Sequence, residues 1–267
     1  MSKECFSNGC IATVDVSYPS TPLFLLYNPE LVKGMMRPIF KYAASEAWPF
    51  DFAPHDVGQY PLAGGQVYGD NKLEGQMPVE ECGNMLIMAA AVTLAEGDAR
   101  FAEEHWGLLS KWAEYLLKHG LDPENQLCTD DFAGHLARNA NLSVKAIMGL
   151  AGYALMLERM GRAIDAERWR LAAGSMVERW KQMAVEDDHS RLAFGADNTW
   201  SLKYNLVWDQ IFGTRLFGDE LPRTETAWYE ARRNRYGTPL DNRATYTKAD
   251  WLVWAASLSS DPSVFAR

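Results

Sequence analysis

Two pairs of long helical patterns, each pair divided by a single glycine, constrain the fold of this chain most strongly. Apolar residues recur at helical spacing over 79–96 and again over 98–119, with Gly97 between the two stretches. The same spacing runs over 142–160 and 164–183, with Gly161 between them. Because glycine readily adopts the left-handed conformation that ends a helix, each pair predicts a tight helical hairpin.

Weaker signals complete the prediction of a mostly helical chain. The triplet Asn28-Pro29-Glu30 combines a capping residue, a proline at the first helical position and an acid in the first turn, which predicts a helix from 28 to about 47. Shorter helices are predicted over 205–212, 221–235 and 248–258, so we expect about eight in all. Alternating apolar residues over 10–16 favour a short strand but no extensive sheet.

Long connections alternate with the short ones, over residues 48–78, 121–141 and 185–204, and they are rich in Gly, Pro, Asp and Asn. This alternation predicts hairpins stacked around an axis, with short turns at one end and long loops at the other. Long loops inside a compact domain are usually functional. We therefore expect any chemistry of this chain to lie in these acidic and aromatic loops.

Composition narrows the class of protein. The 267 residues are 48% hydrophobic and 23% charged, and no linker-like stretch divides them, which indicates one globular domain over 1–267. A net charge of -9 excludes a nucleic-acid partner, because phosphate binding needs clustered Lys and Arg. The chain has no run of eighteen apolar residues and no N-terminal signal pattern, so we expect neither a membrane segment nor export. For the sequence as it stands, we therefore expect a cytoplasmic location. The cysteines, which are scattered without a CxxC, are expected to be reduced thiols, at Cys5, Cys10, Cys82 and Cys128.

The first candidate site residues are His55 and Asp56, which lie in the proline-bounded loop 54–61. A histidine can exchange protons near neutral pH, and the neighbouring carboxylate can orient a substrate hydroxyl or amine. The structural alternative is a turn stabilised by Asp56 with a packed His55.

Glu80, Glu81 and Asn84 form the second group, in the first turns of the helix predicted from residue 79. Acids are common in first turns because they complement the helix dipole. However, Glu80 and Asn84 share one face of a very apolar helix, where a buried carboxylate is costly unless it meets a partner or a substrate. The pattern therefore favours a functional role.

The third group lies in and after the loop that begins at residue 121, and it gathers acids, amides and bases within a short stretch: Asp130, Asp131, His135, Asn141 and Lys145. Two confined carboxyl groups repel when both are charged, so one of them can retain a proton and serve as a general acid. The alternative is a solvated loop that caps the next helix.

Two later segments combine aromatic and hydrogen-bonding residues just before predicted helices, and either could form a wall of a binding site. The first contains Trp200, Lys203 and Tyr204, and the second contains Asp241, Arg243 and Trp251. Packing within the core and helix capping are the structural alternatives for these residues.

Several standard mechanisms lack their signatures here. The sequence contains no GxSxG, HExxH, Walker loop, dinucleotide glycine fingerprint or Ser-x-x-Lys motif. We therefore predict no cofactor and no metal site, and carboxylate-driven hydrolysis of a small polar substrate remains.

Six long motifs, which together span nearly the whole chain, resemble the glutaminase A family. They are FSNGCIATVDVSYPSTPLFLLYNPEL (6–31), APHDVGQYPLAGGQ (53–66), MPVEECGNMLI (77–87), HGLDPENQLCTDDFAGHLARNANLSVKAI (119–147), TWSLKYNLVWD (199–209) and YGTPLDNRATYTKADW (236–251). The resemblance implies a six-hairpin (α/α) toroid and the hydrolysis of L-glutamine to L-glutamate and ammonia without a cofactor. Members are typically longer and secreted or held in the cell envelope, so this chain resembles a partial copy with an incomplete (α/α)6 toroid.

The leading hypothesis is a hydrolase in which one carboxylate activates water and a second group protonates the leaving ammonia. Asp130, Asp131 and Glu81 are the candidate acids, and the other residues named above would bind or orient the substrate. A glycoside hydrolase and a non-catalytic binding domain are the alternatives. All three assume that the acid-bearing connections meet at one mouth of the stacked hairpins.

Overall fold

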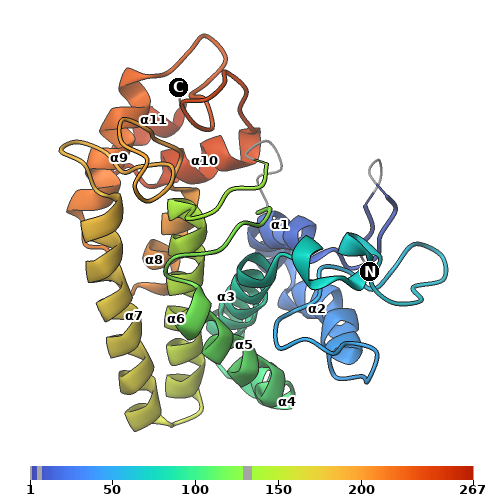
Figure 1. The fold of residues 1–267 in the computed structure, drawn as a ribbon. Coiled ribbons are helices and arrows are strands. Elements are labelled where there is room, and N and C mark those ends of the chain that lie inside the picture. Colours follow the sequence, from blue (N-terminus) through green and yellow to red (C-terminus); the bar gives the residue numbers. More distant parts are fainter. Residues whose placement is uncertain (1, 5–7, 129–133, 267) are drawn as a thin grey trace.

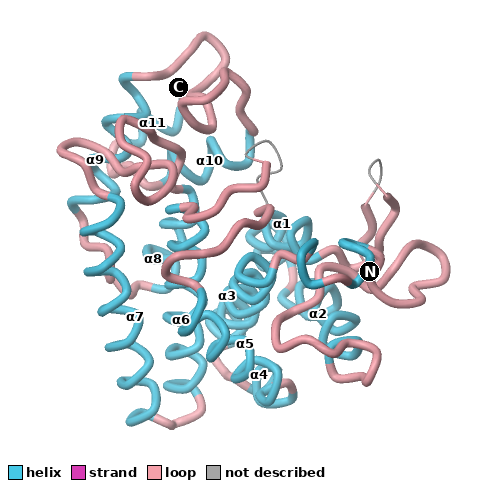
Figure 2. Tube along the Cα trace, in the orientation of Figure 1, coloured by secondary structure: helices cyan, strands magenta, loops and turns pink. Residues whose placement is uncertain are grey.

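The computed structural model describes residues 2–4, 8–128 and 134–266, and they are mostly helical (Figure 1). Figure 2 shows helices joined by loops, and within the described ranges the only β-pairing consists of isolated bridges such as Cys10 with Gln59. The helices are α1 (Val14–Tyr27), α2 (Pro29–Ala43), α3 (Pro78–Glu96), α4 (Arg100–Glu104), α5 (Trp106–His119), α6 (Ala140–Arg159), α7 (Ala163–Ala184), α8 (Val207–Phe212), α9 (Glu220–Ala231), α10 (Ala249–Ser257) and α11 (Pro262–Ala266). Short 3-10 turns are η1 (Tyr68–Asn71), η2 (Leu73–Gly75) and η4 (Tyr204–Leu206).

Three helical hairpins form the body of the molecule, and the glycine-divided patterns predict two of them, α3–α5 and α6–α7. Helix α1 packs on α2, α3 on α5, and α6 on α7, while α1 also packs on α3 and α3 on α6. The chain therefore has an inner row, α1, α3 and α6, backed by outer helices. Because α3 and α6 have neighbours on several sides, both are apolar and buried almost throughout.

Helix α6 is also long and apolar enough to cross a membrane by length and composition. Of its most apolar stretch, 94% is buried inside the protein, where α6 contacts α3, α5 and α7. Burial in a protein core selects the same composition as a membrane does, which accounts for the apolar character of this helix.

The inner helices bring their N-terminal ends to the same end of the molecule. Asp15 is the second residue of α1, Glu81 is the fourth of α3, and Asn141 is the second of α6. Just beyond these first turns, Lys145 of α6 forms an ion pair with Glu80 of α3 and lies over the ring of Tyr18 of α1, so polar contacts join all three helices. Several of the polar residues predicted from sequence therefore lie together at these helix ends. We call this region the mouth, and it consists of Asp15, Tyr18, His55, Glu80, Glu81, Asn84, Asn141 and Lys145.

The predicted strand over 10–16 is wrong, because α1 begins at Val14 and only Cys10 and Ile11 form isolated bridges. Pro19 and Pro22 lie inside this helix and conceal it in the sequence, since each removes a backbone donor. Tertiary burial overrides that local cost, because the side chains of Tyr18 and Thr21 are fully enclosed.

Other boundaries differ less. The helix predicted over 98–119 is two helices, divided at His105, whose ring stacks on Phe40 of α2 with centroids 3.9 Å apart. Helix α2 ends at Ala43 rather than near 47, and eleven α-helices lie in the described ranges where about eight were expected. The described cysteines Cys10, Cys82 and Cys128 are buried and form no disulfide with one another, which agrees with the predicted thiols, and Cys5 lies outside the described residues.

Candidate active site

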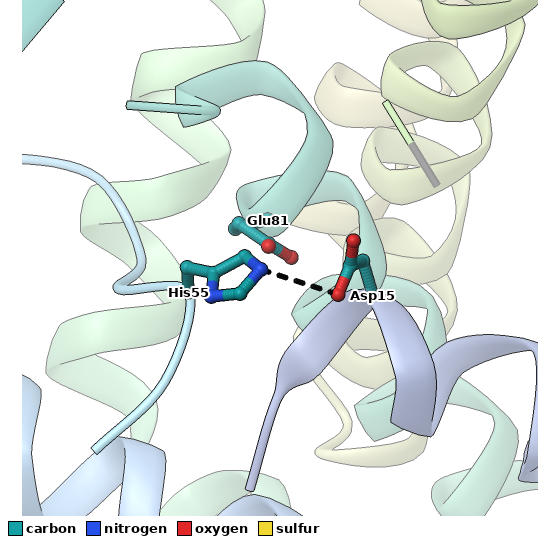
Figure 3. Close-up of side chains that lie close together, drawn as sticks. All are labelled: Asp15, His55 and Glu81. Atoms are coloured by element: carbon teal, nitrogen blue, oxygen red, sulfur yellow. Dashed lines mark ion pairs between the residues drawn. The ribbon is translucent and has the colours of Figure 1, made fainter. Parts of the chain in front are cut away.

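Asp15, His55 and Glu81 converge at the mouth of the inner helices (Figure 3). They come from the first turn of α1, the loop between α2 and α3, and the first turn of α3. The Nε2 atom of His55 lies 3.4 Å from Oδ1 of Asp15, and one atom from each of the three side chains lies within 4.8 Å of the others. Asp15 is 9% exposed and Glu81 only 1%, so Asp15 is the more open to water.

Asp56 holds His55 in place from behind. Its Oδ2 lies 3.0 Å from Nδ1 of His55, and its two oxygens accept backbone N–H groups of Gly58 at 2.7 Å, Val67 at 3.2 Å and Tyr68 at 3.3 Å. The ring of Tyr68 stacks on His55 with centroids 4.1 Å apart. These contacts fix the orientation of the imidazole, so that its other nitrogen faces Asp15.

The surroundings of the cluster shift the pKa values of His55 and Glu81, so that they favour different charge states for the two side chains. Burial alone would lower the pKa of His55, but hydrogen bonds to Asp15 and Asp56 outweigh it and raise that pKa well above its usual value. Burial raises the pKa of Glu81 well above its usual value, and the charge of Asp15 adds to this effect. The surroundings therefore favour the charged form of His55 and the neutral form of Glu81.

Glu80 and Asn84 surround the far side of Glu81. The amide nitrogen of Asn84 lies 3.0 Å from Oε2 of Glu81 and 3.2 Å from Oε1 of Glu80, so it can donate to both carboxyl groups. Glu80 also forms an ion pair with Lys145, which comes from α6, and all of these side chains are buried. Oε1 of Glu81 accepts no hydrogen bond from any described residue.

The network continues across the inner helices. The ammonium group of Lys145 lies 4.1 Å from the centroid of the Tyr18 ring, and the Tyr18 hydroxyl donates to Oδ1 of Asn205 at 2.7 Å. Asn205 in turn donates through Nδ2 to the backbone carbonyl of Asn141 at 3.0 Å. Polar contacts thus connect α1, α3, α6 and η4 at one end of the stack.

Lys203, Asp241 and Arg243 occupy a neighbouring region. Nζ of Lys203 donates to the carbonyl and hydroxyl oxygens of Ser201, each at 2.9 Å, and burial lowers the lysine pKa to about 8. Asp241 is buried and its Oδ2 accepts a hydrogen bond from Nη2 of Arg243 at 2.6 Å. These contacts stabilise the loops that lead into η4.

The predicted aromatic walls are also buried. Tyr204 stacks on Trp251 with centroids 4.0 Å apart. The ring of Trp251 also contacts Trp254 edge to face, and Trp254 contacts Tyr18 of the mouth in the same way. Trp200 is 9% exposed and lies 6.4 Å from Tyr229, measured between ring centroids.

The third predicted group is only partly placed. Asn141 and Lys145 belong to the mouth, whereas His135 is exposed. Asp130 and Asp131, two of the three candidate acids, lie outside the described residues. Of the candidate acids, only Glu81 is therefore located in the structure.

Sequence reasoning missed Asp15. Its segment, VDVSYP, contains two β-branched residues and a proline, which together are typical of the end of a strand. The signal that could have found Asp15 is its place in the first turn of a helix, since Glu81 is a candidate for the same reason. That signal stays hidden as long as α1 is not recognised.

The same three side chains match a divalent cation by donor type, with one imidazole nitrogen and two carboxyl oxygens. In this arrangement Nε2 of His55 already faces Asp15, so the cluster balances its charge internally. A thiol nucleophile is disfavoured, because burial raises the pKa of Cys82 above its usual value and that of Cys10 to about 12.

Two cavities in the C-terminal region lie apart from this cluster. One, of about 530 Å³, is lined by residues such as Tyr229, Thr238 and Leu252, and another, of about 740 Å³, by residues such as Asp209 and Arg223. Neither lining includes Asp15, His55 or Glu81, so cavity size alone would not have located the cluster.

Two curated proteins that are similar to this chain are both named as glutaminases. The Glutaminase A of Aspergillus oryzae is 39% identical to this chain over 97% of the chain and 38% of the relative. A probable glutaminase of Arthroderma benhamiae is 29% identical over 98% of the chain and 40% of the relative. The chain thus spans about two fifths of the length of these curated relatives.

The family comparison agrees with the fold. The model described as the glutaminase A six helical-hairpin domain matches residues 1–267. Its name describes the architecture seen here, in which helical hairpins stack and no sheet forms within the described residues. The chain therefore belongs to the glutaminase A six helical-hairpin domain family.

Proposed function

We propose that this domain hydrolyses the side-chain amide of L-glutamine, giving L-glutamate and ammonia, at Asp15, His55 and Glu81. The observation that carries the proposal is the convergence of the buried side chains of Asp15, His55 and Glu81 at the mouth of the inner helices, where the surroundings favour a charged His55 and a neutral Glu81. The names of the two relatives, Glutaminase A and probable glutaminase, support the same reaction.

Each group has one role in the proposed reaction. Asp15 takes a proton from water as the water oxygen adds to the carboxamide carbon, and Glu81 donates its proton to the nitrogen, which leaves as ammonia. The new carboxylic acid then returns a proton to Glu81, and Asp15 releases its proton to the solvent. His55, which contacts Asp56 through Nδ1, holds Asp15 in position while Asp15 accepts and then releases the proton.

The close approach of the two carboxyl groups suits reaction at a carbonyl carbon. Water and the leaving nitrogen are bonded to the same carbon in the tetrahedral intermediate, so the base and the acid must both reach that carbon. One carboxyl oxygen of Asp15 lies within 4.8 Å of one carboxyl oxygen of Glu81. Among glycosidases, an inverting enzyme needs its carboxyl groups roughly 6.5–9.5 Å apart, whereas about 5 Å fits a retaining enzyme. The spacing therefore disfavours inversion, and a substrate assay separates a retaining glycosidase from an amide hydrolase.

A substrate panel tests the proposal. Ammonia release from L-glutamine and L-asparagine would be measured beside reducing-sugar release from a set of glycosides, with the wild-type chain and Asp15→Asn. We expect ammonia from glutamine, and a loss of about 10²-fold or more in Asp15→Asn because the general base is removed. Glu178→Gln, an exposed site on α7, is the control and should match the wild type.

Two outcomes would overturn the proposal. Sugar release without ammonia release would support the glycoside hydrolase alternative. A folded chain that acts on neither substrate class, yet binds glutamine, would support the binding-domain alternative.

A further inference from the structure

Lys145 of α6 places a positive charge beside the carboxyl groups of α3. It projects from α6, is 1% exposed, and forms an ion pair with Oε1 of Glu80 on α3 while its ammonium lies over the ring of Tyr18. A cation enclosed in this way does not face the solvent, so it is poorly placed to hold a substrate directly.

We propose that Lys145 is a positioning residue that engages Glu80 as its ion-pair partner and thereby makes Glu81 alone the proton donor of the reaction. This inference rests on the proposed function, since it explains how one of two adjacent acids is selected. Two buried carboxyl groups that share one site are not readily ionised together, and the charges that face each of them decide which one keeps the proton.

Asn84 transmits this selection to Glu81. Its Nδ2 lies 3.2 Å from Oε1 of Glu80 and 3.0 Å from Oε2 of Glu81, so it links the two side chains. The remaining oxygen, Oε1 of Glu81, accepts no hydrogen bond from a described residue. Once Lys145 fixes Glu80, Asn84 therefore holds one end of Glu81 and leaves the other oxygen available to carry and donate the proton.

The groups that face Glu81 come from every neighbouring element. Asp15 contributes a negative charge from α1, His55 a positive charge from the loop before α3, and Glu80 a negative charge from α3 itself. Lys145 of α6 acts through Glu80. As long as Glu80 is ionised, its charge favours the protonated form of Glu81.

Gly83 provides the room for this contact. A Cβ atom at Gly83 would lie 2.8 Å from Cγ of Lys145 and 3.2 Å from its Cδ, which is too close for the side chain to remain where it is. The absence of a side chain at position 83 thus lets the lysine stem lie against α3 and reach Glu80.

A carbon-13 NMR titration of Glu-labelled protein tests the inference directly. In the wild type, the Glu80 carboxyl should stay ionised near neutral pH and Glu81 should stay protonated, with Glu80→Gln and Glu81→Gln assigning the signals. In Lys145→Met, Glu80 should take up a proton, and Glu81 should titrate at least about one pH unit lower because its negative neighbour is neutralised.

The pH profile of ammonia release is the second readout. Glu81 must be protonated to act, so the basic limb of kcat/KM should move to lower pH in Lys145→Met by the same amount. Gly83→Ala should move it in the same direction without removing any titratable group, which keeps the test available if Lys145→Met fails to fold. Gly152→Ala, whose added Cβ instead meets Ala90 at the α3–α6 contact and does not meet Lys145, should leave the limb unchanged.

An unchanged Glu80 signal and an unchanged basic limb in Lys145→Met and Gly83→Ala would overturn the inference. Equal shifts in Gly152→Ala would also overturn it, because they would show a general packing effect. If the wild type releases no ammonia, the proposed function fails, while the NMR titration still decides the role of Lys145.

Discussion

At the residue scale, Asp56 shows how one carboxylate can order both a loop and a reactive histidine. It is fully buried and accepts the N–H groups of Gly58, Val67 and Tyr68 as well as Nδ1 of His55. Burial alone would raise the pKa of Asp56, but the hydrogen bond and charge of His55, with the backbone donors, outweigh burial and lower it. Asp56 therefore stabilises the turn and also orients His55, so the two alternatives that its sequence context suggests are compatible.

Asp56→Asn should lower the free energy of unfolding by about 3 kcal/mol at pH 7, because a buried charge loses its partner. A depressed carboxyl pKa stabilises the fold above the unfolded-state pKa of about 4 and loses this effect as the pH falls through the folded value. Urea denaturation of both proteins between pH 3 and 7 should thus show the difference shrinking on acidification. A difference that stays constant with pH would contradict the assignment.

The residues of the mouth are partly predictable from sequence. His55 and Asp56 are candidates because their proline-bounded loop combines a proton-exchanging side chain with a carboxylate. Glu80, Glu81 and Asn84 are candidates because a polar group on a very apolar helix must have a partner, and each of the five residues has one here. The same logic does not select Asp15, because it applies only after the helix that carries Asp15 has been recognised.

At the element scale, the start of α6 is fixed by Asn139. Its side-chain oxygen accepts the backbone N–H groups of Asn141 at 2.9 Å and Leu142 at 3.1 Å, inside the protein. Asn28 caps α2 in a similar way through Glu30, but on the surface. The two caps differ mainly in burial and in the side chains of the next turns, since those after Asn139 include Asn141 and Lys145.

Asn139→Ala should destabilise the fold by about 1–2 kcal/mol and Asn28→Ala by about 1 kcal/mol or less, because an exposed N–H can bond to water instead. Only Asn139→Ala should also reduce ammonia release, since it loosens the turns that carry Asn141 and Lys145. Thermal unfolding and activity assays on both variants check this, and equal activity losses would refute the link between the α6 cap and the mouth.

Helix prediction succeeds where one glycine separates two periodic patterns and fails where tertiary contacts decide. The α3–α5 and α6–α7 hairpins are recognisable from Gly97 and Gly161, which both have a φ of 74°. Helix α1 is not recognisable from the sequence, because Pro19 disfavours a helix locally and burial of its side chains stabilises it nevertheless. The break at His105 depends on stacking with Phe40, a contact between separate elements that no local pattern contains.

At the scale of the whole molecule, buried charges away from the mouth make stability depend on pH. Lys203 is fully buried, and its pKa falls to about 8 from an unperturbed 10.5. Between these values the unfolded chain holds the proton more tightly than the folded one, so the lysine's contribution to stability rises with pH. A tenfold difference in proton affinity between the two states corresponds to about 1.4 kcal/mol.

We therefore expect the wild type to gain stability relative to Lys203→Met by up to about 3 kcal/mol as the pH rises from 8 to 10.5. Comparing the two proteins cancels the opposing effect of tyrosines such as Tyr229, whose pKa is raised well above its usual value by burial. Chemical denaturation across this range provides the measurement, and a pH-independent difference would mean that Lys203 is not desolvated in the folded protein.

The central claim is that Asp15 and Glu81, from different inner helices, act together on one substrate. The most direct test is a double-mutant cycle on kcat/KM for glutamine with Asp15→Asn, Glu81→Gln and the double variant. Groups that act as a unit show non-additive losses, so the double variant should be about as impaired as the worse single variant. Losses that multiply independently, or a single variant with wild-type activity, would contradict the claim.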